Sequence, residues 1–221
     1  MDKISMPQLK DWENFWGRGA SQKFQKISWS KRRILKVLAP CLQPGKSALD
    51  AGCGSGFFAD HFSRQGVMTT AVDYSAAALA MTEKLTQGKV KTVQADFLKE
   101  DLSGKLNTKF DLVFTDGLFE HFSTEEQDKI MRNLLSVLAE GGRIITFVPN
   151  RFSPWEIIRP LFMPGIEEKP FVLPQLVRLQ ERNGLKIIQK GGVNTFPFAV
   201  SVEGKVAEVF GMLLYTVTSR K

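Results

Sequence analysis

Apolar residues between positions 46 and 150 fall into short runs that alternate with stretches of helical periodicity. The runs lie between glycines and polar turn residues, and the helical stretches are rich in Ala, Leu, Glu and Lys. This alternation is typical of repeated βα units, which build a mainly parallel sheet. The pattern predicts five strands, at 47–52, 67–73, 90–96, 110–116 and 143–149.

Helices are expected between these strands. The first covers 57–66 and ends at a glycine, and Ser75 caps a second helix with the sequence AAALAMTEKL, which consists of good helix formers. Ser123 and Glu126 form an S-x-x-E capping box. The helix that follows this box is expected to run to the glycine pair at 141–142.

The pattern changes on both sides of this α/β core. Residues 150–171 contain several prolines and therefore cannot form one regular helix, whereas 8–38 read as one or two helices. A sixth strand is expected at 185–192 and a last strand at 213–221. We predict a single domain with three parts, which are a basic helical N-terminal cap (1–45), the core (46–150) and a C-terminal part (151–221).

Composition and charge narrow the range of functions. The chain is 43% apolar and 24% charged, and it has no apolar run of the roughly 18 residues that a membrane span needs. Its first ten residues, MDKISMPQLK, lack the apolar region of a signal peptide. Two cysteines without a CxxC motif or a Cys/His cluster argue against disulfides and zinc. We expect a cytoplasmic protein without a metal site.

The positive charge is concentrated at the N-terminus. Residues 1–45 hold nine Lys or Arg and three acids, so they supply +6 of the net charge of +7. Attraction for anions would come mainly from this segment. It is either a solvated helix face or a binding surface.

The stretch LDAGCGSGFFADHF, residues 49–62, carries the most information about a ligand. A strand that enters a glycine-rich turn and then a helix brings backbone N–H groups and a helix N-terminus to one spot. A dinucleotide fingerprint needs its third glycine three residues after the second, but here the glycines fall at 52, 54 and 56, and position 57 is Phe. The lysine of a P-loop is also absent. The spacing therefore favours neither NAD nor a nucleoside triphosphate.

Acidic side chains end three successive predicted strands, at Asp73, Asp96 and Asp116. The carboxyl ends of parallel strands face one crevice, where ligands bind. A carboxylate at Asp73 can accept hydrogen bonds from two ribose hydroxyls. Asp96 can accept from an adenine amine, and Phe97 can cover the ring. Each acid alone could be a turn or helix cap, but together they favour a ligand site.

At these residues the chain resembles the class I S-adenosylmethionine-dependent methyltransferases, in particular their small-molecule branch. The resemblance covers about residues 35–150, because several motifs of the family occur in order and at natural spacing. The matching stretches are 49–62, 72–75 (VDYS), 94–97 (QADF), 110–122 and 134–150.

The resemblance implies a Rossmann-like, doubly wound α/β fold with a seven-stranded sheet of order 3-2-1-4-5-7-6 and an antiparallel last strand. It also implies S-adenosyl-L-methionine as cofactor, with the loop glycines near its methionine part, Asp73 on the ribose and Asp96 on the adenine. Asp50 would order the loop and reach the cofactor's amino group through water. The predicted cofactor-binding residues are Asp50, Gly52, Gly54, Gly56, Asp73, Tyr74, Asp96, Phe97 and Asp116.

Methyl transfer from a sulfonium is an in-line displacement, so the protein must mainly hold the acceptor atom close to the methyl carbon. A base is needed only if the acceptor must lose a proton. His121, which follows the fourth strand at the crevice edge, is the candidate base, or else it shapes the loop together with Glu120. Asp116 is a second catalytic candidate and leaves aminopropyl transfer open. His61 is assigned to packing or to the surface.

Substrate selection is assigned to the segment 150–171, which leaves the fifth strand on the crevice side. Its apolar side chains favour an aromatic or lipophilic small-molecule acceptor. Trp155 would contact this acceptor, and Arg151 and Arg159 would bind a carboxylate or phosphate on it. The alternative is that the segment is an ordinary connection between helices.

The N-terminal segment leaves several alternatives open. Trp12, Phe15 and Trp16 share one helix face, which either packs on the core or closes over bound cofactor. The basic residues nearby leave peripheral contact with an anionic membrane open. A nucleic-acid acceptor is disfavoured, because the fourth strand lacks an N/D-P-P-Y/F motif and no Pro-Cys nucleophile occurs. A non-catalytic cofactor-binding regulator is the remaining alternative, and no obligate protein partner is indicated.

Overall fold

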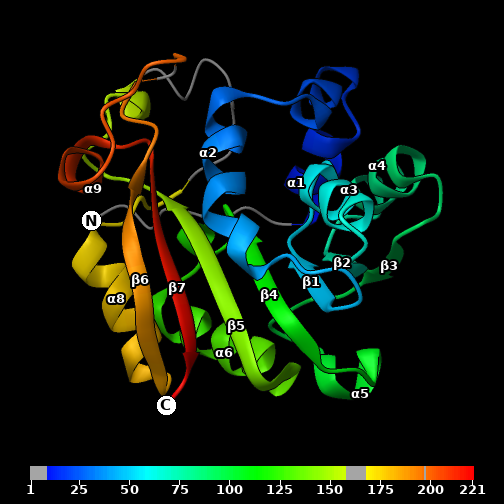
Figure 1. Ribbon diagram of the computed structural model, residues 1–221. Coiled ribbons are helices and arrows are strands. Elements are labelled where there is room, and N and C mark those ends of the chain that lie inside the picture. Colours follow the sequence, from blue (N-terminus) through cyan, green and yellow to red (C-terminus); the bar gives the residue numbers. More distant parts are fainter. Residues whose placement is uncertain (1–8, 158–167, 197) are drawn as a thin grey trace.

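The structure is a computed structural model that describes residues 9–157, 168–196 and 198–221. Within these ranges seven strands form one sheet with the order β3-β2-β1-β4-β5-β7-β6, and helices cover both of its faces (Figure 1). The predicted fold class and strand order are confirmed. The strands are β1 (Ser47–Ala51), β2 (Met68–Asp73), β3 (Lys91–Gln94), β4 (Phe110–Asp116), β5 (Leu138–Pro149), β6 (Leu185–Val193) and β7 (Leu213–Arg220).

Strand β7 runs antiparallel to both of its neighbours, β5 and β6, as predicted. The other paired strands are parallel, and β6 therefore runs in the same direction as β5. The carboxyl ends of β1 to β6 consequently lie along one edge of the sheet. Ligands bind at this edge in open α/β folds.

The helices form where the sequence places caps and amphipathic faces. Ser75 accepts a hydrogen bond from the Ala78 N–H, and the predicted capping box of Ser123 and Glu126 is present. The helices are α1 (Leu9–Trp16), η1 (Gly19–Gln25), α2 (Trp29–Leu38), η2 (Ala39–Cys41), α3 (Phe57–Arg64), α4 (Ala76–Thr86), α5 (Leu102–Leu106), η3 (Phe119–His121), α6 (Thr124–Ser136), α8 (Leu173–Arg182) and α9 (Lys205–Phe210). The sequence did not predict the short helices α5 and α9.

Two apolar layers enclose the sheet, because successive residues of a strand point to opposite faces. In β1, Leu49 packs into the layer under α5, α6 and α8, whereas Ala48 packs into the layer under α2 and α3. In β4, Val113 and Phe114 alternate in the same way. The strands are thus buried on both faces, as expected for the centre of a doubly wound sheet.

The end of α6 differs from the prediction. The helix ends at Ser136, and β5 already begins at Leu138, so the expectation of a helix up to 141–142 was wrong. Leu138 pairs with Phe110, after which the register between β4 and β5 shifts. A Cβ on Gly142 would lie 3.0 Å from the Phe110 carbonyl oxygen, so this glycine allows close approach of two strands rather than ending a helix.

Candidate active site

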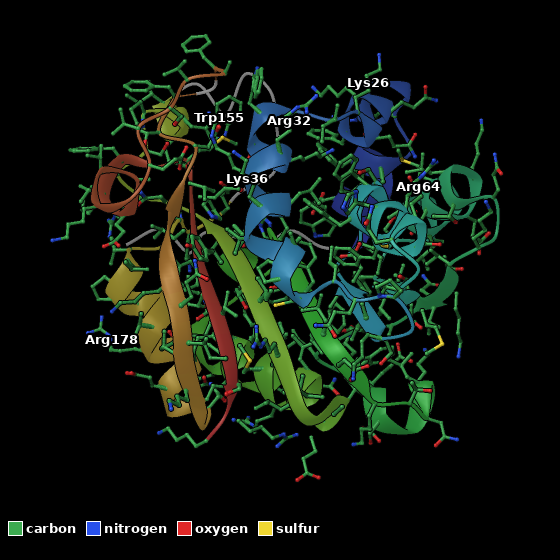
Figure 2. The ribbon with its side chains drawn as sticks, viewed as in Figure 1. Lys26, Arg32, Lys36, Arg64, Trp155 and Arg178 are labelled. Carbon is green, nitrogen blue, oxygen red and sulfur yellow. The ribbon has the colours of Figure 1, made fainter. Side chains whose placement is uncertain are left out.

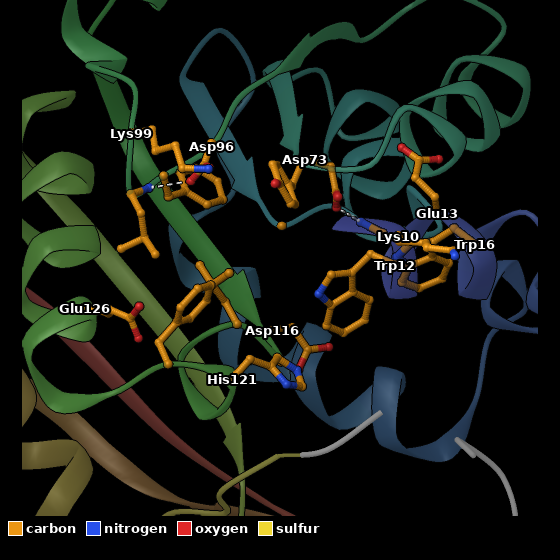
Figure 3. A pocket seen from close by; sticks show the side chains of 18 residues that line it. Lys10, Trp12, Glu13, Trp16, Asp73, Asp96, Lys99, Asp116, His121 and Glu126 are labelled. Atoms are coloured by element: carbon orange, nitrogen blue, oxygen red, sulfur yellow. Dashed lines mark hydrogen bonds and ion pairs between the residues drawn. The ribbon is translucent and has the colours of Figure 1, made fainter. Parts of the chain in front are cut away.

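A cavity of about 1010 Å³ lies at the carboxyl ends of β1, β2 and β4 (Figure 3). Its walls come from α1, the glycine loop after β1, the ends of β2 and β4, the turn after β3, and the residues around η3. Seven of the nine predicted cofactor-binding residues line it, and His121 lies at one side. These seven are Gly52, Gly54, Asp73, Tyr74, Asp96, Phe97 and Asp116.

The glycine loop is fastened to the end of β2 through Asp73. The Gly54 N–H donates to Asp73 Oδ2 at 2.8 Å, and the Ser75 N–H donates to Oδ1 at 2.9 Å. Burial raises the pKa of Asp73 to about 6, the two backbone hydrogen bonds oppose this, and the charge of Glu13 adds to it. Each oxygen keeps accepting capacity, since a carboxylate oxygen has two lone pairs.

Two predicted cofactor-binding residues lie behind the loop instead of on the cavity wall. A Cβ on Gly56 would lie 2.7 Å from the Cα of Thr82 in α4, so this glycine allows the loop to pack on a helix. Asp50 is 2% exposed, and its Oδ2 has no hydrogen-bond partner. Burial, and after it the charge of Asp116, raises the pKa of Asp50 to about 8. Contact of either residue with the cofactor stays a prediction.

The turn after β3 holds Asp96 in a defined orientation. Its Oδ1 accepts from the Leu98 N–H at 2.9 Å, and Lys99 Nζ lies 3.2 Å from Oδ2. Phe97 is 5% exposed and lies beside it on the cavity wall. An acceptor atom next to an aromatic ring suits recognition of a base that has an exocyclic amine.

Helix α1 forms the wall opposite β4 and brings Trp12, Glu13 and Trp16 to the cavity (Figure 3). The Glu13 carboxylate accepts from the Ala76 N–H at 2.6 Å and from the Ala77 N–H at 3.1 Å, which fastens α1 to the start of α4. Phe15 is buried, as expected for a helix face that packs on the protein, while Trp12 and Trp16 line the cavity; closure of this face over bound cofactor stays a prediction. The role of Glu13 was missed, because its partners lie more than 60 residues away.

The other side of the cavity contains a buried group of polar side chains around His121. His121 is 5% exposed, its ring lies edge-on to Trp12 at 4.9 Å between centroids, and its Nε2 is 3.8 Å from Glu120 Oε1. Glu120 is 2% exposed, and burial, followed by the charge of Glu168, holds its pKa well above the usual range. Glu120, His121 and Glu168 each bring one atom to within 4.8 Å of the others.

Asp116 faces a lysine that the sequence did not single out. Loss of water contact raises the pKa of Asp116 to about 6, and the positive charge of Lys31 opposes this rise. Burial lowers the pKa of Lys31 to about 8, and its Nζ lies 4.0 Å from the centroid of the Phe57 ring. Within the basic run of the N-terminus, nothing distinguished this lysine from its neighbours.

Of the three residues assigned to acceptor binding, two belong to the described part of the chain. Arg151 is exposed and Trp155 half-buried, and neither lines the cavity, while Arg159 lies outside the described residues. The segment instead brings Lys169 to Glu120, since the Lys169 N–H donates to the Glu120 carbonyl at 2.8 Å. The negative charges of Glu168 and Glu156 therefore help to raise the pKa of Glu120. The proposed roles of the two arginines and of Trp155 stay predictions.

Comparison with known proteins agrees with this geometry. Residues 48–142 match the family described as "Methyltransferase domain". A SAM-dependent methyltransferase from Anabaena variabilis superposes with a TM-score of 0.71 at 15% identity, covering 100% of this chain and 99% of that one. Magnesium protoporphyrin IX methyltransferase from Synechocystis, with bound SAH, gives a TM-score of 0.64 at 16% identity and covers 96% of this chain and 94% of that one.

Curated relatives share a part of the sequence. The chloroplastic magnesium protoporphyrin IX methyltransferase of Arabidopsis thaliana is 28% identical over 108 residues, which are 49% of this chain and 34% of that protein. A ubiquinone biosynthesis O-methyltransferase from Nitrobacter winogradskyi is 28% identical over 169 residues, or 70% of this chain and 62% of that protein. The match spans between a third and a half of the length of the first such relatives.

Residues 48–142 therefore resemble a methyltransferase domain, and the sheet has the strand order that the resemblance to class I S-adenosylmethionine-dependent methyltransferases implied. The cavity fits the predicted cofactor, S-adenosyl-L-methionine. Asp73 keeps accepting capacity for ribose hydroxyls, and Asp96 and Phe97 suit the adenine. A Cβ on Gly54 would lie 2.6 Å from the Trp16 ring, so this glycine gives room to α1, and contact of Gly52 and Gly54 with the methionine part stays a prediction. Among the helices in the described ranges, none has the length and apolar character of a membrane span.

Proposed function

We propose that the chain transfers a methyl group from S-adenosyl-L-methionine to a small acceptor that is aromatic or lipophilic. The observation that supports this proposal is that one cavity of about 1010 Å³ is lined both by seven of the predicted cofactor-binding residues and by His121. Its volume matches the upper range of ligand pockets, about 1,000 Å³, and so provides space for a cofactor and an acceptor together.

The cofactor supplies a methyl group on a sulfonium, which is a good leaving group. The part of the protein is then to hold the acceptor atom in line with the bond that breaks and to keep water out. Trp12 and Trp16 of α1 close one side of the cavity, and Phe122 and Leu118 line the other. These apolar walls support an acceptor with an apolar body.

We assign the base to His121, for acceptors that must lose a proton. Its ring borders the cavity, and Glu120 Oε1 lies 3.8 Å from its Nε2, so this carboxyl is placed to orient the imidazole. Asp116 is the second candidate. A carboxyl whose pKa is about 6 is mostly ionised at neutral pH and accepts a proton more readily than an ordinary aspartate.

The test is a screen of metabolite fractions with methyl-labelled cofactor, with and without added RNA or lipid. His121→Ala should lower turnover about tenfold or more at unchanged cofactor affinity, because one positioned base contributes on the order of 10²-fold or more. His61→Ala is the matched control, since His61 lies on α3 and does not line the cavity.

Each outcome of this screen is informative. Unchanged turnover in His121→Ala excludes His121 as the base. Cofactor binding without transfer to any fraction favours a non-catalytic regulator, and transfer confined to the RNA samples favours a nucleic-acid acceptor. The cytoplasmic location also stays a prediction, because relatives include chloroplastic and mitochondrial proteins.

A further inference from the structure

The chain between β6 and β7 exposes many large apolar side chains within a short stretch. We call residues 195–210, which contain α9, the apolar loop. Seven of its described side chains are between 44% and 83% exposed: Phe196, Phe198, Val200, Val202, Val206, Val209 and Phe210. Scattered exposed apolar residues are ordinary, but a contiguous group marks an interaction surface.

Hydrogen bonds and an ion pair hold the described residues of this loop in place. Arg33 of α2 is 9% exposed, donates to the Phe198 carbonyl at 2.7 Å, and forms an ion pair with Glu203 at 2.7 Å. Within the loop, the Phe196 N–H donates to Ser201 Oγ at 3.1 Å. Several polar groups of the loop are thus paired with α2 or with one another, while the seven apolar side chains stay exposed.

The apolar loop shares the sheet edge of the cofactor cavity. Since β6 runs parallel to β5, the chain leaves both strands at the same edge, and Figure 1 shows the loop and α9 there. Asn150, just after β5, donates to the Val209 carbonyl at 2.8 Å. Phe152 and Ile157 follow with 58% and 82% exposure and extend the apolar surface.

Basic side chains of α2 and β6 lie near the apolar loop. Trp29 in the first turn of α2 is 44% exposed, and the Arg32 guanidinium carbon lies 5.4 Å from its ring centroid. Arg32 and Lys36 project from α2 in Figure 2. A second cavity, of about 320 Å³, lies beside the loop; its basic lining residues are Arg33, Lys36 and Lys190, and its acidic ones are Glu203 and Glu208. Among the described residues neither lysine has an ion-pair partner, whereas Arg33 in the same cavity is paired with Glu203.

We propose that this face docks on an anionic lipid bilayer, with the apolar loop inserted at headgroup level and Lys36 and Lys190 on lipid phosphates. Aromatic and aliphatic side chains beside Trp, Arg and Lys are the composition of interfacial membrane binding. A second copy of the chain fits less well, because a two-fold contact would bring the basic side chains of both copies together. The proposal is independent of methyl transfer.

The test is vesicle flotation of the full chain without cofactor or acceptor. Binding is expected to phosphatidylcholine vesicles that contain phosphatidylglycerol, to be much weaker without it, and to decrease with added salt. Phe198→Ser should weaken binding about tenfold, because one buried Phe ring is removed from the bilayer. The pair Lys36→Gln and Lys190→Gln should weaken binding to the anionic vesicles alone.

Matched controls are exposed residues that belong neither to the apolar loop nor to the second cavity. Met68→Ser removes a side chain that is 64% exposed at the opposite edge of the sheet, and Arg178→Gln removes an exposed charge on α8. Both should leave binding unchanged. Absence of wild-type flotation overturns the proposal, as does equal loss in Met68→Ser. A dimer in light scattering that Phe198→Ser dissociates, without vesicle binding, overturns it in favour of a second copy.

Discussion

Replacement of Gly56 by alanine tests whether the glycine loop needs this residue in order to pack on α4. Gly56 has a φ of +78°, and a Cβ there would lie 2.5 Å from Thr82 Oγ1 and 2.7 Å from Thr82 Cα. The left-handed backbone costs an alanine about 1–2 kcal/mol. Overlap with a backbone atom adds about 1–3 kcal/mol, because α3 and α4 must move apart.

A part of this loss of stability is offset, because alanine has less conformational freedom than glycine in the unfolded chain. This effect stabilises the folded state by about 0.4–1 kcal/mol. The net loss in the free energy of unfolding is thus about 1–5 kcal/mol. For a chain of this length, this corresponds to a fall in Tm of roughly 2–20 °C. Urea denaturation followed by circular dichroism measures the loss in the free energy of unfolding.

Gly88→Ala is the matched control. Gly88 has a φ of +71°, but nothing lies within 4 Å of its Cβ position, so only the backbone cost of about 1–2 kcal/mol remains. Thr82→Ala combined with Gly56→Ala should restore stability only in part, because the Thr82 Cα stays in place. Equal losses in the Gly56 and Gly88 variants, or full restoration by Thr82→Ala, would refute the reasoning.

Two further predictions concern pH. The pKa of Asp50 is about 8 in the folded state and 3.8 in the unfolded chain, so the folded protein binds more protons, and its stability falls by ~5 kcal/mol as pH rises from about 4 to 8. Asp50→Asn should flatten this dependence in urea titrations at several pH values, and an unchanged slope would contradict it. Cofactor affinity should decrease as pH falls below about 6, where Asp73 becomes protonated. Calorimetry at pH 5 to 8 tests this, with Asp73→Asn expected to bind weakly at every pH; constant wild-type affinity would argue against a role for the carboxylate.

The parts that sequence reasoning predicted correctly rest on local signals. Apolar runs located the seven strands within a few residues, and the alternation of strands and helices indicated the parallel core. The strand-end acids Asp73, Asp96 and Asp116 do line one cavity, because parallel strands bring their carboxyl ends to one edge. Cap residues such as Ser123 were also predicted, since a cap acts within three residues.

The parts that it missed depend on contacts between distant positions. Lys31 could not be distinguished from other basic residues until the fold placed it opposite Asp116. Glu168 reaches Glu120 across a segment rich in proline, for which no periodicity exists. Gly142 looked like a helix end, because the sequence does not show that Phe110 passes close to it. Glycines that allow close packing and glycines that end helices look alike in a sequence.

Tryptophans at two places in the protein can serve as intrinsic fluorescence probes. Trp12 and Trp16 line the cofactor cavity, whereas Trp29 lies 44% exposed beside the apolar loop. Quenching of intrinsic fluorescence should therefore follow occupancy of the cavity without any label. A blue shift from Trp29, isolated in a variant with Trp12, Trp16 and Trp155 replaced by Phe, would report a less polar environment at the other surface. One chain thus offers separate readouts for its two faces.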